Sequence, residues 1–204
     1  MRITQLKQLS SDRFLLTFDD AGELRVPLNL VADLSLYTGK ELDGTEYAAL
    51  INAAQLSGAK ERAMRLISLR PMSEKELRDK LVEKGESPEN AEECVRWLLD
   101  LHLLDDVQYA GLVVRHYAAK GYGPGRVKNE LFRRGIPRAL WDGALCELPA
   151  QEDTVYRLLC SRLRGAGTED RAAVKKATDA LFRRGYSWDE IRSALERYKS
   201  EMSE

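Results

Sequence analysis

The sequence predicts a mainly α-helical protein, a tandem array of three three-helix repeats preceded by a small α+β segment that contains a β-hairpin. One observation is an internal repeat, because a ten-residue segment ending in Arg133-Arg134-Gly135 returns fifty residues later, ending in Arg183-Arg184-Gly185. A weaker copy ends at Gly85. The other observation is that the preceding chain shows the two-residue alternation of β-strands. Internal periodicity of this length is typical of tandem units that bury their apolar faces against neighbours.

Residues 1–58 are predicted to contain the hairpin. Apolar residues alternate over residues 14–18 and again over residues 24–28, and residues 19–22 between them are Asp, Asp, Ala and Gly. Alternation on both sides of such turn-forming residues favours two antiparallel strands. A third strand is expected over residues 2–8.

Two helices are expected between the hairpin and the first repeat. The shorter one covers residues 30–37 and the longer one residues 45–56. Asp43 stands three residues before Glu46, the spacing at which the two side chains cap a helix start. The segment as a whole is expected to form an α+β cap on the helical array.

The three repeats are assigned to residues 59–104, 105–149 and 150–204, with three helices expected in each. Helix starts are indicated by cap residues, namely Ser73 with Glu76, Ser87 before Pro88, Asp105, and Ser187 with Glu190. Breaks between helices are expected at residues 121–125 and at residues 165–167, which are rich in glycine. The third helix of the first repeat should end near Leu101 and bury Cys94, Val95, Leu98 and Leu101.

The middle helix of each repeat is the copied segment. Apolar residues four positions apart define its buried face: Leu77 with Leu81, Val127 with Leu131, and Ala177 with Leu181. The residues expected to widen this face are Val82, Phe132 and Phe182. A glycine at position 85, 135 or 185 is expected to end each helix in the left-handed conformation.

Composition indicates an ordinary globular chain of 204 residues, with 44% hydrophobic and 32% charged residues. No apolar run approaches the roughly 20 residues of a membrane helix, and the first residues lack the apolar block of a signal peptide. A cytoplasmic monomer with no membrane partner is therefore expected. The cysteines, Cys94, Cys146 and Cys160, are expected to be buried and reduced, because they form no Cys-x-x-Cys pair.

A search for catalytic or metal-binding residues finds no motif. His102 and His116 lie in different repeats and have no paired metal spacing. The glycine-rich residues 121–126 follow no buried strand and lack the Gly-Lys-Ser/Thr of a phosphate loop. The prediction is a protein that is not an enzyme and that has no cofactor and no metal site.

The second repeat is the most basic part of the chain. Its 7 basic and 5 acidic residues contrast with the 5 basic and 8 acidic residues of the N-terminal segment, although the whole chain has a net charge of −1. A solvated helix face explains much of this charge, since basic residues near a helix C-terminus complement the helix dipole. The alternative is a surface for phosphates or for an acidic protein groove, with tyrosine available for stacking. Its candidate residues are Arg115, Lys120, Tyr122, Arg126, Lys128, Arg133, Arg134 and Arg138.

Two ordered groups of residues carry a family resemblance. The group in the first repeat is Ser73-Glu74-Lys75-Glu76-Leu77, Lys80-Leu81 and Lys84-Gly85. The group in the second repeat is Asp106-x-x-Tyr109-Ala110, Arg115, Lys120-Gly121-Tyr122-Gly123, Glu130-Leu131 and Arg133-Arg134-Gly135-Ile136. Over residues 59–197 the chain resembles the RecX family, bacterial regulators of the RecA recombinase.

The resemblance implies three tandem three-helix repeats and no catalytic centre. It also implies binding to RecA and to the RecA–DNA filament, within the helical groove of the filament, and binding to single- and double-stranded DNA. Family members restrain recombinase, ATPase and coprotease activity by limiting filament extension or promoting disassembly. The N-terminal β segment departs from the smallest family members, so the resemblance implies no role for it. The alternative hypothesis is a helical-repeat DNA-binding or scaffold module unrelated to RecA.

Overall fold

The computed structural model describes residues 1–164 and 169–202, so the break expected at residues 165–167 lies outside the described residues. The chain divides into two compact units. Unit 1 contains residues 1–71 and 77–103, and unit 2 contains residues 72–76 and 104–204. The first turn of one helix, α3 (Glu74–Glu83), therefore belongs to unit 2 and its remainder to unit 1.

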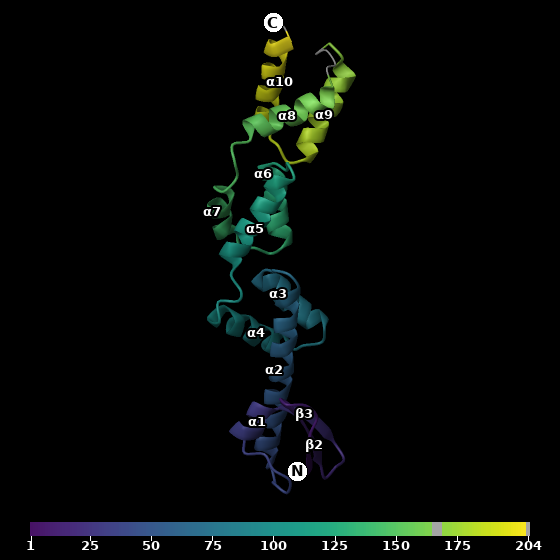
Figure 1. Ribbon diagram of the computed structural model, residues 1–204, viewed down its shortest axis with the longest axis vertical. Coiled ribbons are helices and arrows are strands. Elements are labelled where there is room, and N and C mark those ends of the chain that lie inside the picture. The colour runs from purple at the N-terminus through teal and green to yellow at the C-terminus, as the bar shows by residue number, and fades with distance from the viewer. Residues whose placement is uncertain (165–168, 203–204) are drawn as a thin grey trace. The chain divides into compact units, whose positions relative to one another are not determined.

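Unit 1 begins with a three-stranded antiparallel sheet in the order β1-β2-β3. The strands are β1 (Ile3–Gln8), β2 (Arg13–Phe18) and β3 (Glu23–Pro27). Leu16 on the central strand is paired with Leu6 on one side and Leu24 on the other. The predicted hairpin and third strand are confirmed. Buried residues of β1, β2 and β3 form a core with Leu50 and Ala54 of the long helix that lies beside the sheet (Figure 1).

The short helix after the sheet, α1 (Leu28–Asp33), starts and ends earlier than the expected residues 30–37. Pro27 occupies the position before its first residue, where the fixed φ of proline is compatible with a helix start. Ser35 has a φ of 46°, in the left-handed region that does not continue a helix. The predicted bounds of this helix, residues 30–37, were therefore wrong at both ends.

The long helix α2 (Gly44–Leu69) joins two segments that the sequence predicts as separate helices. Its start is the predicted capping box, in which Asp43 accepts from the backbone N–H groups of Thr45 and Glu46. Gly58 does not interrupt it, because one interior glycine costs only about 1 kcal/mol relative to alanine. Ala59 and Ala63, four residues apart, are fully buried. The boundary assigned between residues 58 and 59 thus falls within one helix, and the assigned repeat boundaries remain a prediction.

The rest of unit 1 follows the predicted first repeat. After α3, Ser87 caps α4 (Pro88–Asp100) by accepting from the Asn90 backbone N–H. Cys94, Val95 and Leu98 are buried as predicted. Leu101 is exposed, contrary to the prediction, because it stands one residue beyond the end of α4 and leaves the buried face.

Unit 2 contains two further helical groups, each with its own core. The first comprises α5 (Asp106–Ala119), α6 (Pro124–Arg133), a 3₁₀ turn at Arg138–Leu140 and α7 (Trp141–Leu145). The second comprises α8 (Glu152–Leu163), α9 (Arg171–Arg183) and α10 (Trp188–Met202). Asp105 caps α5 and Ser187 with Glu190 forms the predicted capping box before α10. The mainly helical prediction with a small N-terminal sheet is confirmed.

The glycines that end the copied helices have φ values of 92° at Gly85, 68° at Gly135 and 91° at Gly185. All three are in the left-handed region, as predicted. The residues expected to widen the buried face are instead exposed: Val82, Phe132 and Phe182. Each follows a fully or almost fully buried leucine, and one residue turns a helix by about 100°, which carries the next side chain off the buried face.

The three cysteines differ from the prediction that all are buried. Cys94 is buried, Cys160 is half-buried and Cys146 is exposed, and all three are free thiols. Cys146 lies just beyond the short helix α7, where little of the chain covers it. Burial raises the pKa of the Cys94 thiol, which keeps it protonated and unreactive.

Candidate binding surface

Helix α6 presents the basic residues that the sequence singles out. Gly123 precedes the helix and Pro124 occupies its first turn, where a missing N–H costs no hydrogen bond. Val127 and Leu131 are fully buried, and Arg126 and Lys128, which flank this buried face on its two edges, are exposed. These two side chains are available to a partner.

Arg126 also lies over an aromatic ring. Its guanidinium carbon is 6.0 Å from the ring centroid of Tyr122, at the outer limit of a cation–π contact. Tyr122 is half-buried and packs against Tyr117, with ring centroids 5.5 Å apart. Tyr122 is therefore part of the support for Arg126, and only part of its ring reaches solvent.

Arg133 and Arg134 both bind the buried carboxylate of Glu130. Nη2 of Arg133 donates to Glu130 Oε1 at 2.6 Å, and Nε of Arg134 donates to the same oxygen at 3.0 Å. The side chain of Arg133 is 72% exposed and that of Arg134 is 23% exposed. Burial alone would raise the pKa of Glu130, but the hydrogen bond from Arg133 and the two positive charges hold this pKa below its ordinary value. Arg133 thus keeps a large exposed face, whereas Arg134 is engaged within unit 2.

Arg134 makes two further hydrogen bonds in unit 2. Its Nη1 donates to the Tyr109 hydroxyl, which in turn donates to Glu76 Oε2 at 2.9 Å. The Ser73 hydroxyl donates to the backbone carbonyl of Arg134 at 2.5 Å. These contacts tie the end of α6 to residues 72–76. They give Arg134 a structural role inside unit 2.

The same arrangement recurs fifty residues later with Arg184. The backbone N–H of Gly123 donates to the carbonyl of Arg184 at 2.9 Å, and the Ser73 hydroxyl donates to the carbonyl of Arg134 at the equivalent position. Nη1 of Arg184 also donates to the carbonyls of Lys120 and Gly121, both at 3.0 Å. Its guanidinium carbon lies 5.5 Å from the Tyr122 ring centroid. Sequence reasoning missed Arg184, although the fifty-residue offset from Arg134 was a signal that could have found it.

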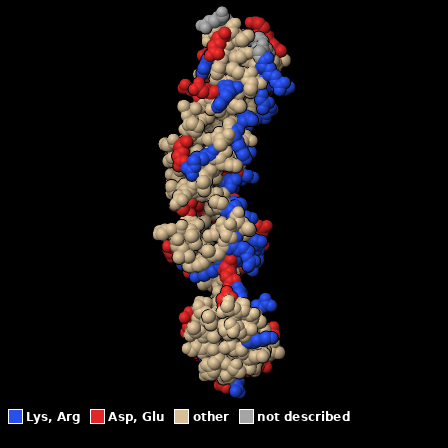
Figure 2. All heavy atoms as spheres, in the orientation of Figure 1, with Lys and Arg blue, Asp and Glu red and all other residues tan. Residues whose placement is uncertain are grey.

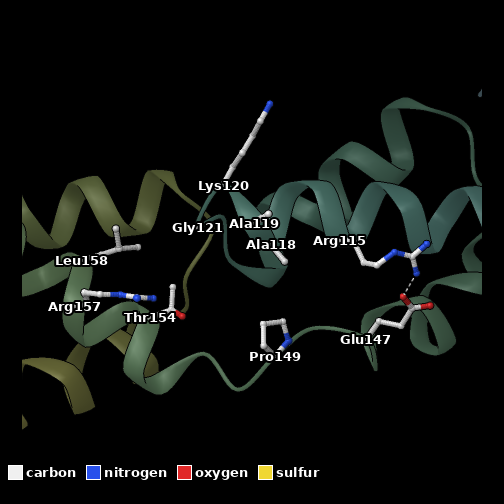
Figure 3. A pocket seen from close by; sticks show the side chains of 10 residues that line it. All are labelled: Arg115, Ala118, Ala119, Lys120, Gly121, Glu147, Pro149, Thr154, Arg157 and Leu158. Atoms are coloured by element: carbon white, nitrogen blue, oxygen red, sulfur yellow. Dashed lines mark hydrogen bonds and ion pairs between the residues drawn. The ribbon is translucent and has the colours of Figure 1, made fainter. Parts of the chain in front are cut away.

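A pocket of about 600 Å³ lies between α5 and α8 and contains three basic side chains, Arg115, Lys120 and Arg157. Figure 3 shows that they do not converge, because Arg115 points to Glu147 and Lys120 points away from the pocket. Arg115 is ion-paired with Glu147, which cancels its charge. The pocket therefore lacks the convergent charges that would hold a small anion.

Arg138 lies apart from the α6 residues, in the 3₁₀ turn before α7. It is exposed, and its guanidinium carbon is 5.6 Å from the ring centroid of Trp141. The Trp141 indole N–H donates to the Ile136 carbonyl at 3.0 Å, which fixes the ring beneath Arg138. Of the eight candidates, Arg126, Lys128 and Arg133 share the exposed part of one helix.

Basic side chains continue from α6 onto α9. Figure 2 shows Lys and Arg along one side of unit 2, over these two helices. The exposed basic residues of α9 are Arg171, Lys175, Lys176 and Arg183. The exposed basic residues of unit 2 therefore extend beyond the second repeat onto α9.

Within the described residues, no three His, Cys, Asp or Glu side chains come together in a way that could hold a metal ion. A search of the same residues for a helix long and apolar enough to cross a membrane found none. The described titratable groups with shifted pKa values take part in structural contacts, as Tyr109 does, whose pKa is raised by burial and by its hydrogen bond to Glu76.

Three tandem helical groups define a helical-repeat protein. Family models agree with this class in each repeat: the first three-helix domain of RecX matches residues 59–98, the second matches residues 105–145, and the third matches residues 150–195. The chain belongs to the RecX family of regulatory proteins.

Individual relatives extend this comparison. The chain is 33% identical over 138 residues to the regulatory protein RecX of Vibrio campbellii, covering 67% of this chain and 89% of that protein. It is 34% identical over 135 residues to the regulatory protein RecX of Xanthomonas citri, covering 66% of this chain and 83% of that protein.

Solved structures show the same fold. A crystal structure of regulatory protein RecX has a TM-score of 0.78 at 24% identity, with 96% of this chain and 98% of that chain covered. A RecX structure from Lactobacillus salivarius has a TM-score of 0.65 at 25% identity, with 71% and 97% covered. The first match is long enough to include most of the N-terminal α+β segment, so that segment also has a counterpart in a solved fold.

Proposed function

We propose that this protein is a non-enzymatic regulator that binds RecA and the RecA–DNA filament as a monomer. In this proposal it restrains recombinase, ATPase and coprotease activity by limiting filament extension or by promoting disassembly. Membership of the RecX family supports a regulatory role, and the finer mechanism is our inference.

The observation that carries the proposal is the set of exposed basic side chains on α6. Arg126 and Lys128 have no ion pair among the described residues, and Arg133 keeps most of its side chain in solvent despite its bond to Glu130. Exposed arginines and lysines on a rigid helix suit a surface of opposite charge, either a phosphate backbone or an acidic protein groove. Because Arg134 is engaged inside unit 2, we do not include it in the proposed contact. Arg115 and Arg138 are peripheral to this contact.

The test compares purified protein with assembled RecA filaments and with free single-stranded DNA, using co-sedimentation and RecA-dependent ATP hydrolysis. We expect the protein to sediment with filaments and to lower ATP hydrolysis while hydrolysing no ATP itself. If the protein, added at a concentration similar to that of RecA, left filament assembly and ATP hydrolysis unchanged, the proposal would be refuted. Binding to DNA alone, with no effect on filaments, would favour a DNA-binding module unrelated to RecA.

A further inference from the structure

The N-terminal sheet has an inner face that belongs to the core of unit 1 and an outer face that does not. Ile3, Leu16 and Val26 are buried on the inner face, in one core with residues of α2. Side chains alternate between the two faces of a strand, so Leu15 points to the outer face. Leu15 is half-buried and is not part of that core. The outer face is therefore open to a partner.

The register of the sheet places a basic side chain on each side of Leu15. Lys7 of β1 is paired with Leu15 of β2, and Leu15 is paired in turn with Arg25 of β3. Directly paired residues of neighbouring strands point to the same face. Adjacent strands are about 4.8 Å apart, so the backbones of Lys7 and Arg25 are roughly 10 Å apart. The outer face therefore carries an aliphatic side chain between two cations.

These two cations are available to a partner. Lys7 and Arg25 are both exposed, and neither forms an ion pair among the described residues. Arg13, which points to the same face two residues before Leu15, is instead paired with Glu61 of α2. The charges of Lys7 and Arg25 are therefore not cancelled within unit 1.

Charge is distributed unevenly over residues 1–58. The outer face of the sheet holds three of the five basic residues of this segment, Lys7, Arg13 and Arg25, and one of its eight acidic residues, Glu23. The remaining seven acidic residues lie in the turns, loops and helices. The acidic net charge of the segment therefore does not describe this face, which is positive and complements an acidic partner.

We propose that this outer face, defined by Lys7, Leu15 and Arg25, binds an extended acidic peptide segment of a partner protein, in which an apolar side chain lies between carboxylates. The apolar side chain covers Leu15, and the carboxylates pair with the two cations. Nucleic acid fits this face less well, because none of the outward-facing residues of β1, β2 and β3 is aromatic and able to stack a base. The proposal goes beyond the proposed function, which rests on α6 and gives the N-terminal segment no role.

The experiment uses the full chain without RecA and a fluorescein-labelled peptide of about 12 residues that repeats glutamate, leucine and aspartate. At about 3.3 Å per residue, such a peptide is long enough to cross the three strands when extended. Fluorescence anisotropy gives the dissociation constant. Lys7→Glu with Arg25→Glu should weaken binding about tenfold or more, because two attractive charges become repulsive. Lys7→Gln with Arg25→Gln removes the charges without reversing them and should cause a smaller loss.

The apolar part of the contact is tested separately. Leu15→Thr keeps a residue type that suits a strand and should weaken binding of the leucine peptide by about 3- to 10-fold, because apolar area is lost from the contact. A second peptide, with serine in place of leucine, should bind the original protein more weakly and should not respond to Leu15→Thr.

Two controls fix the surface and the class of ligand. Arg126→Glu with Lys128→Glu makes the same charge change on α6 and should alter the affinity for the leucine peptide less than about twofold, because distant sites act independently. Oligo(dT) of about 15 nucleotides, a length within the site sizes of single-strand binders, should bind equally well to the original protein and to both Lys7 and Arg25 double variants. Circular dichroism confirms that each variant is folded, and the glutamine variant decides the test if the glutamate variant does not fold.

Four results would each overturn the proposal. They are no measurable binding of the leucine peptide, equal binding of the two peptides, a loss from the α6 variant as large as that from the Lys7 and Arg25 variants, and a loss of oligo(dT) binding in the Lys7 and Arg25 variants as large as their loss of peptide binding. Because RecA is absent, none of these results bears on the regulatory proposal.

Discussion

Nε of Arg134 donates to the buried carboxylate of Glu130 at 3.0 Å, one helical turn away, and so turns a residue expected at the surface into an internal cation. The same guanidinium reaches the Tyr109 hydroxyl, and the Arg134 carbonyl accepts from Ser73. Arg133, its neighbour in sequence, binds the same carboxylate from the solvent side. Of these two adjacent arginines, Arg134 therefore has a structural role and Arg133 remains mostly exposed to solvent.

The first prediction compares the contributions of Arg134 and Arg133 to stability. Arg134→Ala should lower the free energy of unfolding by about 2–3 kcal/mol, because it removes hydrogen bonds and a charge partner from a carboxylate that is 3% exposed. Arg133→Ala should lower it by less than about 1 kcal/mol, because the Arg133 side chain is 72% exposed, solvent screens its attraction to Glu130, and Arg134 still pairs with that carboxylate in the variant. Urea unfolding followed by circular dichroism measures both. Equal losses from the two variants would show that Arg134 is not the structural member of the pair.

The second prediction concerns pH. The folded protein holds the pKa of Glu130 below its ordinary value, so its carboxylate stabilises the fold fully above the unfolded pKa of about 4.3. That contribution is lost as pH falls below this value and through the lower folded pKa. Glu130→Gln removes the titrating group. The stability gap between the original protein and the variant should be constant from about pH 7 to pH 5 and should shrink below about pH 4. Urea midpoints measured from pH 3 to pH 7 test this, and a gap that widens in acid would contradict it.

The third prediction uses two glycines with nearly the same backbone conformation. Gly185 and Gly85 have φ values of 91° and 92°, but a Cβ on Gly185 would lie 2.1 Å from the backbone nitrogen of Arg126, whereas one on Gly85 would meet nothing within 4 Å. Gly85→Ala should therefore cost only the left-handed strain of about 1 kcal/mol. Gly185→Ala should cost about 3 kcal/mol or more, because α6 must move.

Urea unfolding measures both glycine variants, and hydrogen exchange in α6 and α9 locates the damage from Gly185→Ala. We expect faster exchange in both helices, since the Gly185 carbonyl also accepts from Gly125 across this contact. Equal costs at the two positions, with unchanged exchange in α6, would show that the close approach of Gly185 to α6 does not contribute to stability.

The fifty-residue period predicted most of the local structure. It marked the copied helices, the left-handed glycines and the buried pairs such as Val127 with Leu131, all of which depend on neighbours within one or two helical turns. The α2 helix was predicted in two pieces, because local propensity does not reveal that buried alanines on both sides of Gly58 hold it in one helix.

The candidate surface was only partly predictable. Sequence identified the basic residues of α6, but the internal contacts of Arg134 are with Tyr109 and Ser73, which are 25 and 61 residues away. The stack of Phe182 on Trp188 was missed because Phe182 was assigned to the buried face one position too far around the helix. The fifty-residue offset from Arg134 could have pointed to Arg184, but its hydrogen bonds to the carbonyls of Lys120 and Gly121 join distant segments and required the structure.

The most direct test of the account measures binding to assembled RecA filaments after charge reversal on α6. Arg126→Glu with Lys128→Glu should weaken binding roughly tenfold or more, because two exposed cations become repulsive at a complementary surface. If phosphates are the partner, the salt dependence should also fall by about one unit per lost contact. The control is Lys175→Glu with Lys176→Glu, an equal charge change on α9 that we expect to have a smaller effect. Unchanged binding by the α6 variant, or equal loss from both variants at unchanged helical content, would contradict the claim that α6 makes the main contact.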